Sequence, residues 1–285
     1  MASELLSSLM SRHRLGFAVR CWARAAWRLT TRGGGSPTHT LQVSLERLRA
    51  VLDRLEGRDI RMYRMATALA PYASHPDVPQ FHRQIDECRQ QLDDIGRLAI
   101  ARGIRLSTHP GQYTVLNSED PSVRAAAIAE LEVQAALLEE CVSRRRRSSF
   151  FTSAVRARGT AAATDRFIEG FEKLSDRARA RLAVENDDRS FALVDVPPLA
   201  RRCAVPVVWD VLHHRCHDPA ALADDEALRV ALATWPPGVI PKIHYSSPRL
   251  DVEEQKRRDG RRVERRLSFL SCVRPRRRPG AHPAT

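Results

Sequence analysis

The chain has 285 residues, of which 43% are hydrophobic, and a formal net charge of +13. This length and composition suit one large α/β barrel or two ordinary domains, and the basic excess predicts attraction to polyanions, with a merely solvated basic surface as the alternative. No apolar stretch reaches the roughly 20 residues of a membrane span, and the six cysteines form no C-x-x-C pair, which excludes a membrane protein, a disulfide framework and a zinc finger and favours the cytoplasm.

Short apolar runs alternate with amphipathic helical stretches along the chain. Strands are expected at 15–19, 60–65, 104–108, 182–185, 205–211 and 240–245. Helices are expected at 41–55, 80–101, 121–141, 165–180, 193–203 and 218–234. Repeated strand–helix units favour a parallel sheet, and no G-x-G-x-x-G follows the first strand. The pattern therefore predicts a TIM-type (β/α)₈ barrel rather than a dinucleotide-binding fold.

Acidic and imidazole side chains stand at or just after the expected strand ends, together with one lysine. They are His75, His109, Glu185, Asp210, His213, Lys242 and His244. In a barrel the carboxyl ends of the strands meet at one rim, where the chemistry is placed. Carboxylates and imidazoles that recur at this rim indicate a multinuclear metal site.

The densest of these signals is Asp210 with His213, three residues apart in a segment that holds two further histidines. Four potential ligands within eight residues are hard to explain by packing. Glu185 ends its strand, where an acidic residue could simply cap the next helix. The two aspartates that follow, Asp187 and Asp188, can fill that capping role, which leaves Glu185 free to bridge metals. Lys242 and His244 should share one face of their strand, since side chains repeat every two residues.

His109 ends its strand before a Pro-Gly turn, and Gln112 and Tyr113 follow on the loop. A lone histidine in this position is more often structural than a ligand, and a surface turn is the alternative for the loop. A loop tyrosine beside an amide could also wedge into a base stack and probe a DNA lesion.

Taken together, these segments resemble the UV damage endonuclease family. They match in order and register: Ser74-His75-Pro76, His109-Pro-Gly-Gln-Tyr, Glu185-Asn-Asp-Asp, Asp210-x-x-His213-His-Arg-Cys and Lys242-Ile-His244-Tyr-Ser. The likeness covers about residues 57–141 and 160–266. It implies a barrel like that of the endonuclease IV type, in a monomeric DNA repair enzyme that nicks double-stranded DNA 5′ of UV photoproducts.

The resemblance also implies roles for the rim residues. The metal ligands would be His109, Glu185, Asp210, His213 and His244, with His75 as a further possibility. They would hold up to ~3 divalent ions, usually manganese, with Glu185 bridging two of them and acting in catalysis. Lys242, the second catalytic residue, matches a lysine that is carboxylated in the family. Gln112 and Tyr113 match the residues that enter the duplex at the lesion.

Three stretches depart from the family pattern: 20–40, 142–158 and 268–285. The family's fourth strand carries His-Val-Gly-Gly, whereas residues 148–155 read Ser-Ser-Phe-Phe-Thr-Ser-Ala-Val. GC-rich codons for this octapeptide, regrouped from the third letter, encode Val-Val-Leu-His-Val-Gly-Gly, which suggests a compensated frameshift; a divergent loop is the alternative. We expect one domain over 1–267, incomplete at strand 4 and at the C-terminal strand, then a basic tail over 268–285, with poor folding or weak activity.

Two other functions stay open. A sugar isomerase or epimerase could share a metal-bearing barrel, although the basic charge and the Gln112-Tyr113 pair argue against it. A frameshifted copy could instead be a non-catalytic DNA-binding remnant, whose binding would depend on salt without any metal-dependent cleavage.

Overall fold

The computed structural model describes residues 16–18, 40–111, 114–141, 151–154 and 161–245. Within these ranges seven parallel strands pair in chain order. They are β1 (Gly16–Ala18), β2 (Met62–Met65), β3 (Arg105–Thr108), β4 (Phe151–Ala154), β5 (Leu182–Glu185), β6 (Val207–Asp210) and β7 (Ile243–His244). A doubly wound sheet would reverse its order at a switch point, whereas a barrel adds each strand beside the last. The expected TIM-type α/β fold is therefore confirmed.

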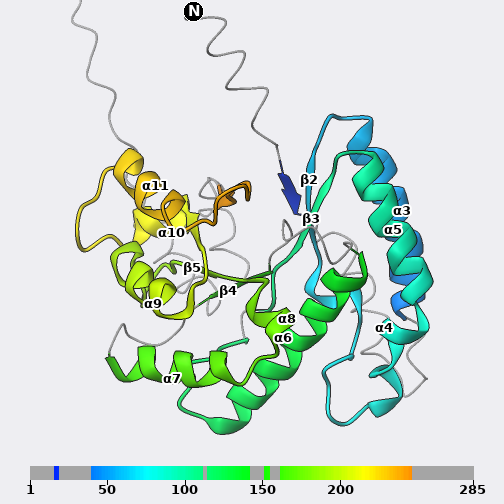
Figure 1. Ribbon diagram of the computed structural model, residues 1–285, viewed down its shortest axis with the longest axis horizontal. Helices are drawn as coiled ribbons and strands as arrows, with labels where there is room; N and C mark the ends of the chain where they lie inside the picture. Colours follow the sequence, from blue (N-terminus) through cyan, green and yellow to red (C-terminus); the bar gives the residue numbers. More distant parts are fainter. Residues whose placement is uncertain (1–15, 19–39, 112–113, 142–150, 155–160, 246–285) are drawn as a thin grey trace, which may run out of the picture.

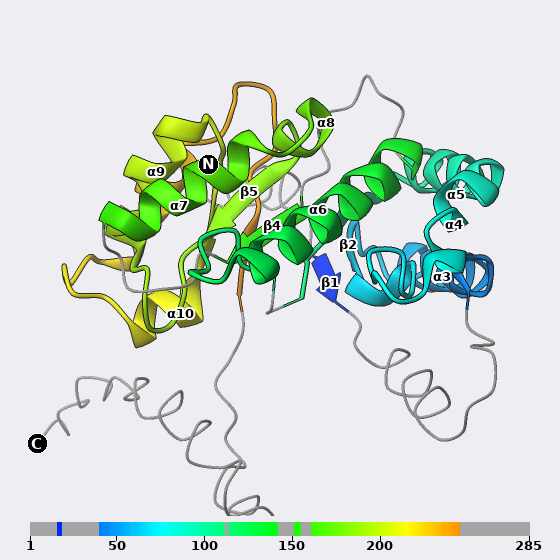
Figure 2. The same cartoon turned by 90° about the horizontal axis from the view of Figure 1, so that it is seen from below.

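Helices connect the strands and lie outside them. The longer helices are α3 (Leu41–Glu56), α5 (Arg89–Ala101), α6 (Pro121–Cys141), α7 (Ala161–Glu172), α9 (Val196–Cys203) and α11 (Asp224–Leu232). Shorter helical segments are η1 (Thr67–Leu69), η2 (Pro79–Phe81), α4 (Gln84–Glu87), α8 (Asp176–Arg179), η3 (Leu193–Asp195) and α10 (Val211–Cys216). Figure 1 shows α3 and α5 on one side of the strands, α6 and α7 on a second, and α9 to α11 on a third. The turned view shows α6 and α7 crossing the strands (Figure 2), so the helices form an arc around the sheet.

The leucine spacing of α3 explains how one helix face enters the core. Five leucines repeat every three or four residues and are at most 4% exposed: Leu41, Leu45, Leu48, Leu52 and Leu55. This stripe is the amphipathic pattern expected from the sequence, and each buried leucine contributes about 1.5–3 kcal/mol to stability. On the neighbouring α5, a Cβ at Gly96 would lie 1.6 Å from the carbonyl oxygen of Cys141, so only glycine permits this approach of α5 to α6.

Two predicted helices are interrupted in the structure. The helix expected over 80–101 consists of η2, α4 and α5, because Cys88 adopts non-helical angles (φ −99°, ψ 16°) between α4 and α5. The helix expected over 165–180 stops at Glu172 and restarts as α8. There Ser175 acts as the N-cap, its Oγ accepting the Ala178 N–H, and Glu132 on α6 accepts the N–H and hydroxyl of Ser175.

The expectation of an incomplete fourth strand is not confirmed, because the chain forms a strand, β4, at this position. β4 pairs with β5 from Phe151↔Leu182 to Ala154↔Glu185, and with β3 at Thr108↔Phe151. Main-chain hydrogen bonds do not depend on which side chains the residues carry. A segment that departs from the family sequence but keeps its length can therefore still pair with the neighbouring strands. The C-terminal strand, which we expected to be incomplete, residues 20–39, the tail at 268–285 and the rest of 142–158 lie outside the described residues. The frameshift stays a hypothesis, which the nucleotide sequence tests: a neighbouring frame should encode His-Val-Gly-Gly.

The two faces of the β7 segment differ in exposure. Ile243 and Tyr245 are 45% and 70% exposed, whereas Lys242 is 3% exposed and His244 is largely covered. The alternation places Lys242 and His244 together on the inner face, as their spacing predicts.

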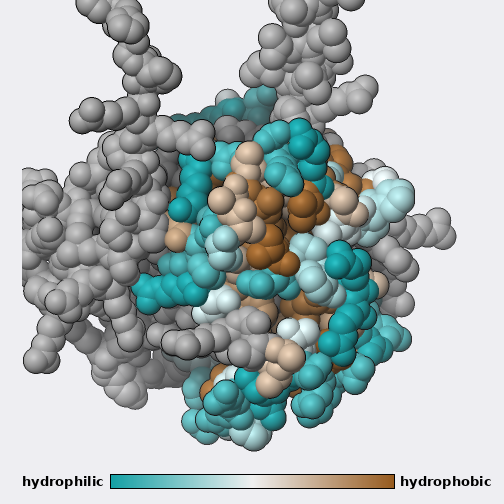
Figure 3. All heavy atoms as spheres, turned by 90° about the vertical axis from the view of Figure 1, so that its left-hand side faces the viewer, coloured by the Kyte–Doolittle hydropathy of each residue, from teal (hydrophilic) through white to brown (hydrophobic). Residues whose placement is uncertain are grey.

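Hydrophobic side chains gather on the side of the molecule that carries α9 to α11, bordered by hydrophilic residues (Figure 3). Among the described helices, none has the length and apolarity needed to cross a bilayer.

Candidate metal centre

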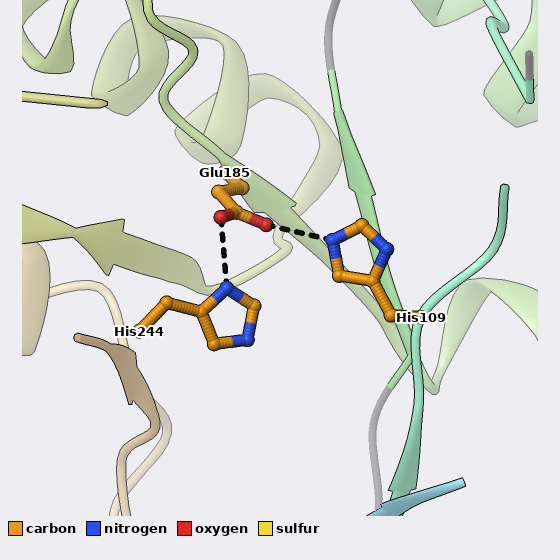
Figure 4. A group of neighbouring side chains, drawn as sticks. All are labelled: His109, Glu185 and His244. Atoms are coloured by element: carbon orange, nitrogen blue, oxygen red, sulfur yellow. Dashed lines mark hydrogen bonds and ion pairs between the residues drawn. The ribbon is translucent and has the colours of Figure 1, made fainter. Parts of the chain in front are cut away.

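A buried carboxylate lies at the centre of the candidate site. Glu185 ends β5, and its side chain is 3% exposed. Its Oε2 lies 3.1 Å from Nε2 of His109, which follows β3, and its Oε1 lies 2.8 Å from Nδ1 of His244 on β7. Figure 4 shows the carboxylate between the two rings. Parallel strands with their carboxyl ends at one rim bring these three distant residues together.

A second pair of side chains lies on the other side of the same carboxylate. Asp210 ends β6 and caps α10, its Oδ1 accepting the His213 N–H at 2.9 Å. Nδ1 of His213 lies 3.8 Å from Glu185 Oε1 and 3.9 Å from Asp210 Oδ2. The aspartate cap starts a helix directly after the strand.

Two groups of potential ligands therefore share Glu185. One is His109, Glu185 and His244, and the other is Glu185, Asp210 and His213; within each group the ligand atoms lie within 4.8 Å of one another. Imidazole nitrogens and carboxylate oxygens are ligands for Mn²⁺, Zn²⁺ and related divalent ions. The described residues thus contain two adjoining candidate metal positions with a common carboxylate.

The hydrogen bonds of the histidines fit bound cations. The Pro110 carbonyl lies 2.8 Å from His109 Nδ1 and can only accept, so it holds the proton of a neutral ring there. The Nε2 lone pair of His109 then faces the Glu185 carboxylate, an arrangement that needs a cation or a second proton between them. Nε2 of His244, the ring nitrogen that does not face Glu185, is buried without a hydrogen-bond partner among the described residues.

The charge states also suit metal binding, which requires ionised carboxylates and neutral imidazoles. Burial acts to raise the pKa of Glu185, but His244 and His109 outweigh it and hold that pKa well below its usual range. Burial lowers the pKa of His244 to about 4, so its ring is neutral at pH 7. Burial and the nearby Glu185 raise the pKa of Asp210 to about 6, although His213 opposes them.

Lys242 is the buried cation of this rim. Burial, reinforced by Arg64, lowers its pKa to about 7, while Glu185 acts in the opposite direction. A lysine with this pKa exchanges between amine and ammonium near neutral pH, as lysines with catalytic roles do.

Besides Lys242, one described residue of the predicted site, His75, lies outside these groups. His75 is half-exposed: its Nδ1 accepts the Asp77 N–H, its carbonyl lies against His82, and its ring packs edge-on against Tyr72. Gln112 and Tyr113 lie outside the described residues.

Sequence reasoning missed residues that position the potential ligands without belonging to either group. Thr67, in η1 after β2, donates its hydroxyl to the His109 carbonyl at 2.6 Å. Asn186 contacts the main chain of Asp210 through both ends of its side chain. No spacing pattern marks a threonine or an asparagine for such a contact, because the partner is a main-chain group on another strand.

Comparison with known proteins gives a consistent result. The family described as "UV-endonuclease UvdE" matches residues 38–274. A UV DNA damage endonuclease of Clostridium perfringens is 30% identical over 206 residues, covering 71% of this chain and 49% of that protein. A UV-damage endonuclease of Neurospora crassa is 33% identical over 206 residues, covering 68% of this chain and 31% of that protein. The chain thus spans half or less of the length of these two relatives.

A solved structure gives the same match in three dimensions. The structure titled "Crystal Structure of SacUVDE" has a TM-score of 0.66 and 27% sequence identity, and the match covers 86% of this chain and 88% of that one. The likeness therefore extends over most of the fold as well as the rim segments.

Proposed function

Because the chain belongs to the UV-endonuclease family, we propose that it is a metal-dependent DNA repair endonuclease that nicks the backbone 5′ of UV photoproducts in excision repair. The observation that carries this proposal is Glu185, buried between His109 and His244 and close to His213 and Asp210. Phosphodiester cleavage needs concentrated positive charge at the reacting phosphate, and a shared carboxylate can hold two cations side by side.

Each residue of the rim has a proposed part in this chemistry. Bound divalent ions, for which we propose Mn²⁺, would supply an activated water and stabilise the charge that develops on the phosphate. Glu185 would serve both ion positions. His109 and His244 would complete one position, and Asp210 and His213 would complete the other.

Lys242 is proposed as the second catalytic group. It is buried on the same strand face as His244, and its pKa of about 7 gives it both protonation states near neutral pH. As an ammonium it can neutralise charge at the phosphate, and as an amine it is the form that carboxylation requires. In either protonation state the side chain of Lys242 lies close enough to Glu185 to act in the same site.

Double-stranded DNA with UV lesions is the proposed substrate. The net charge of +13 favours a polyanionic partner. Gln112 and Tyr113 directly follow the Pro110-Gly111 turn beside His109, and we propose that they contact the lesion. We further propose that the protein acts as a monomer in the cytoplasm.

The proposal predicts that the full chain converts UV-irradiated supercoiled plasmid to the nicked form only when Mn²⁺ is present. Unirradiated plasmid should stay supercoiled, and EDTA should abolish nicking until Mn²⁺ is restored. We expect weak cleavage, because the stretch at residues 148–155 lacks the family's His-Val-Gly-Gly. Salt-dependent binding to DNA without nicking would instead support a DNA-binding remnant, and turnover of a small sugar with no effect on DNA would support an isomerase or epimerase.

Metal affinity should depend on pH in a defined direction. Asp210 has a pKa of about 6, and Asp210 and Glu185 raise the pKa of His213 against the effect of burial. Below the pKa of each group protons compete with the ion, and each proton that must leave lowers affinity about tenfold per pH unit. Mn²⁺ affinity of the full chain, measured by calorimetry, should therefore rise with pH through about 6, where Asp210 ionises, and continue to rise until His213 is neutral. An affinity that does not rise with pH would contradict ligation by Asp210 and His213.

A further inference from the structure

Asn186 is a buried amide directly after Glu185, with 0% of its surface exposed. Its Oδ1 accepts the main-chain N–H of Asp210 at 2.9 Å, and its Nδ2 donates to the main-chain carbonyl of Asp210 at 3.1 Å. The backbone pairing of β5 with β6 is last recorded one residue earlier, at Glu185↔Val208. The side chain of Asn186 thus continues the connection between the two strands where one ends and the other carries Asp210.

The main chain of Asn186 contacts a second residue of the same group. Its carbonyl oxygen lies 3.0 Å from Nδ1 of His213. A carbonyl can only accept, so Nδ1 of neutral His213 carries the proton and Nε2 keeps its lone pair. A histidine whose other nitrogen is held in this way has one defined nitrogen for a metal.

We propose that Asn186 is a positioning residue for the Glu185–Asp210–His213 group: its amide fixes the main chain of Asp210 and its carbonyl fixes the tautomer of His213. This inference rests on the proposed metal-dependent function. Asparagine suits the position because its side-chain amide carries a donor and an acceptor, which reach the carbonyl and the N–H of Asp210 at the same time. An isosteric leucine would leave both main-chain groups of Asp210 without this partner, and a serine would be too short to bond both.

Calorimetric titration of the full chain with Mn²⁺ tests the proposal, with Asn186→Leu, Asn186→Ser and Thr234→Val compared to wild type. Thr234→Val is the matched control. Thr234 Oγ1 accepts the Val207 N–H at 2.8 Å, so this variant removes a side-chain hydrogen bond from the far end of the same strand β6. Both Asn186 variants should lower the affinity of one Mn²⁺ by about 10- to 100-fold and spare the other, while Thr234→Val spares both.

A second measurement does not depend on a variant that folds. Long-range ¹H–¹⁵N spectra of the metal-free wild-type chain should assign the proton of neutral His213 to Nδ1. An Nε2–H tautomer, full affinity in both Asn186 variants, or equal losses in Thr234→Val would each overturn the positioning role. If the wild-type chain binds no Mn²⁺ at all, the proposed function fails and this inference fails with it; if wild type binds and the variants match it, only this inference fails.

Discussion

Replacing Glu185 with glutamine is expected to reduce Mn²⁺-dependent nicking by on the order of 10³-fold or to background, because a metal ion contributes several kcal/mol to the reaction. Glutamine keeps the shape of the side chain but removes the charge shared by both ligand groups. The same variant should lose most of its Mn²⁺ affinity. The fold should persist, since the side chain lies at the end of a fully buried strand that remains intact. Nicking assays, calorimetry and circular dichroism would measure these effects.

Glu130→Gln provides the matched control for this variant. Glu130 is also a largely buried carboxylate, but it lies on α6, where it accepts hydrogen bonds from Ser74 and Gln134. Its replacement should leave Mn²⁺ affinity and nicking close to wild type. Equal effects of Glu130→Gln and Glu185→Gln would show that the loss comes from a buried carboxylate in general, and would contradict the bridging role.

Changing Lys242 to methionine is expected to separate activity from stability. Burial lowers the pKa of Lys242 from 10.5 to about 7, so the unfolded chain holds this proton more tightly than the folded chain. Wild-type stability should therefore rise with pH between about 7 and 10.5. Methionine fills similar volume without the charge, so the melting temperature should rise by a few °C at pH 7, and this gain should shrink as the pH approaches 10.5. Nicking should fall by about 10²-fold or more.

Lys173→Met is the control for Lys242→Met, because Lys173 is an exposed lysine after α7. This variant should change neither the melting temperature nor nicking appreciably. A Lys242→Met chain that melts well below wild type would show that the ammonium is stabilised in the folded state, and one that nicks normally would remove Lys242 from the proposed chemistry.

Strand ends could be predicted well because a short apolar run gives way there to an acidic or imidazole side chain. Strand β5 has the predicted bounds: its four residues are at most 2% exposed and end at the first acidic side chain. Helix α6 also has the predicted bounds, with Pro121 at its first position. All five members of the two groups of potential ligands lie at or just after strand ends that the sequence predicts.

What the sequence did not predict depends on contacts between distant segments or on local backbone angles. The break at Cys88 interrupts a continuous helical pattern, so side-chain periodicity gave no sign of it. His75 was named by its position after a strand, yet its nitrogen accepts a local N–H and it joins neither ligand group. Asn186 has no pattern of its own, since its role depends on the main chain of Asp210, 24 residues away.

Cleavage of a duplex that contains one defined UV photoproduct tests the central claim most directly. The full chain would be incubated with the end-labelled lesion strand in the presence of Mn²⁺, beside an undamaged duplex and the Glu185→Gln variant. The account predicts a cut immediately 5′ of the lesion that requires Mn²⁺ and is absent from both controls. Cleavage of the undamaged duplex to the same extent, or an uncut lesion strand in the presence of Mn²⁺, would contradict it.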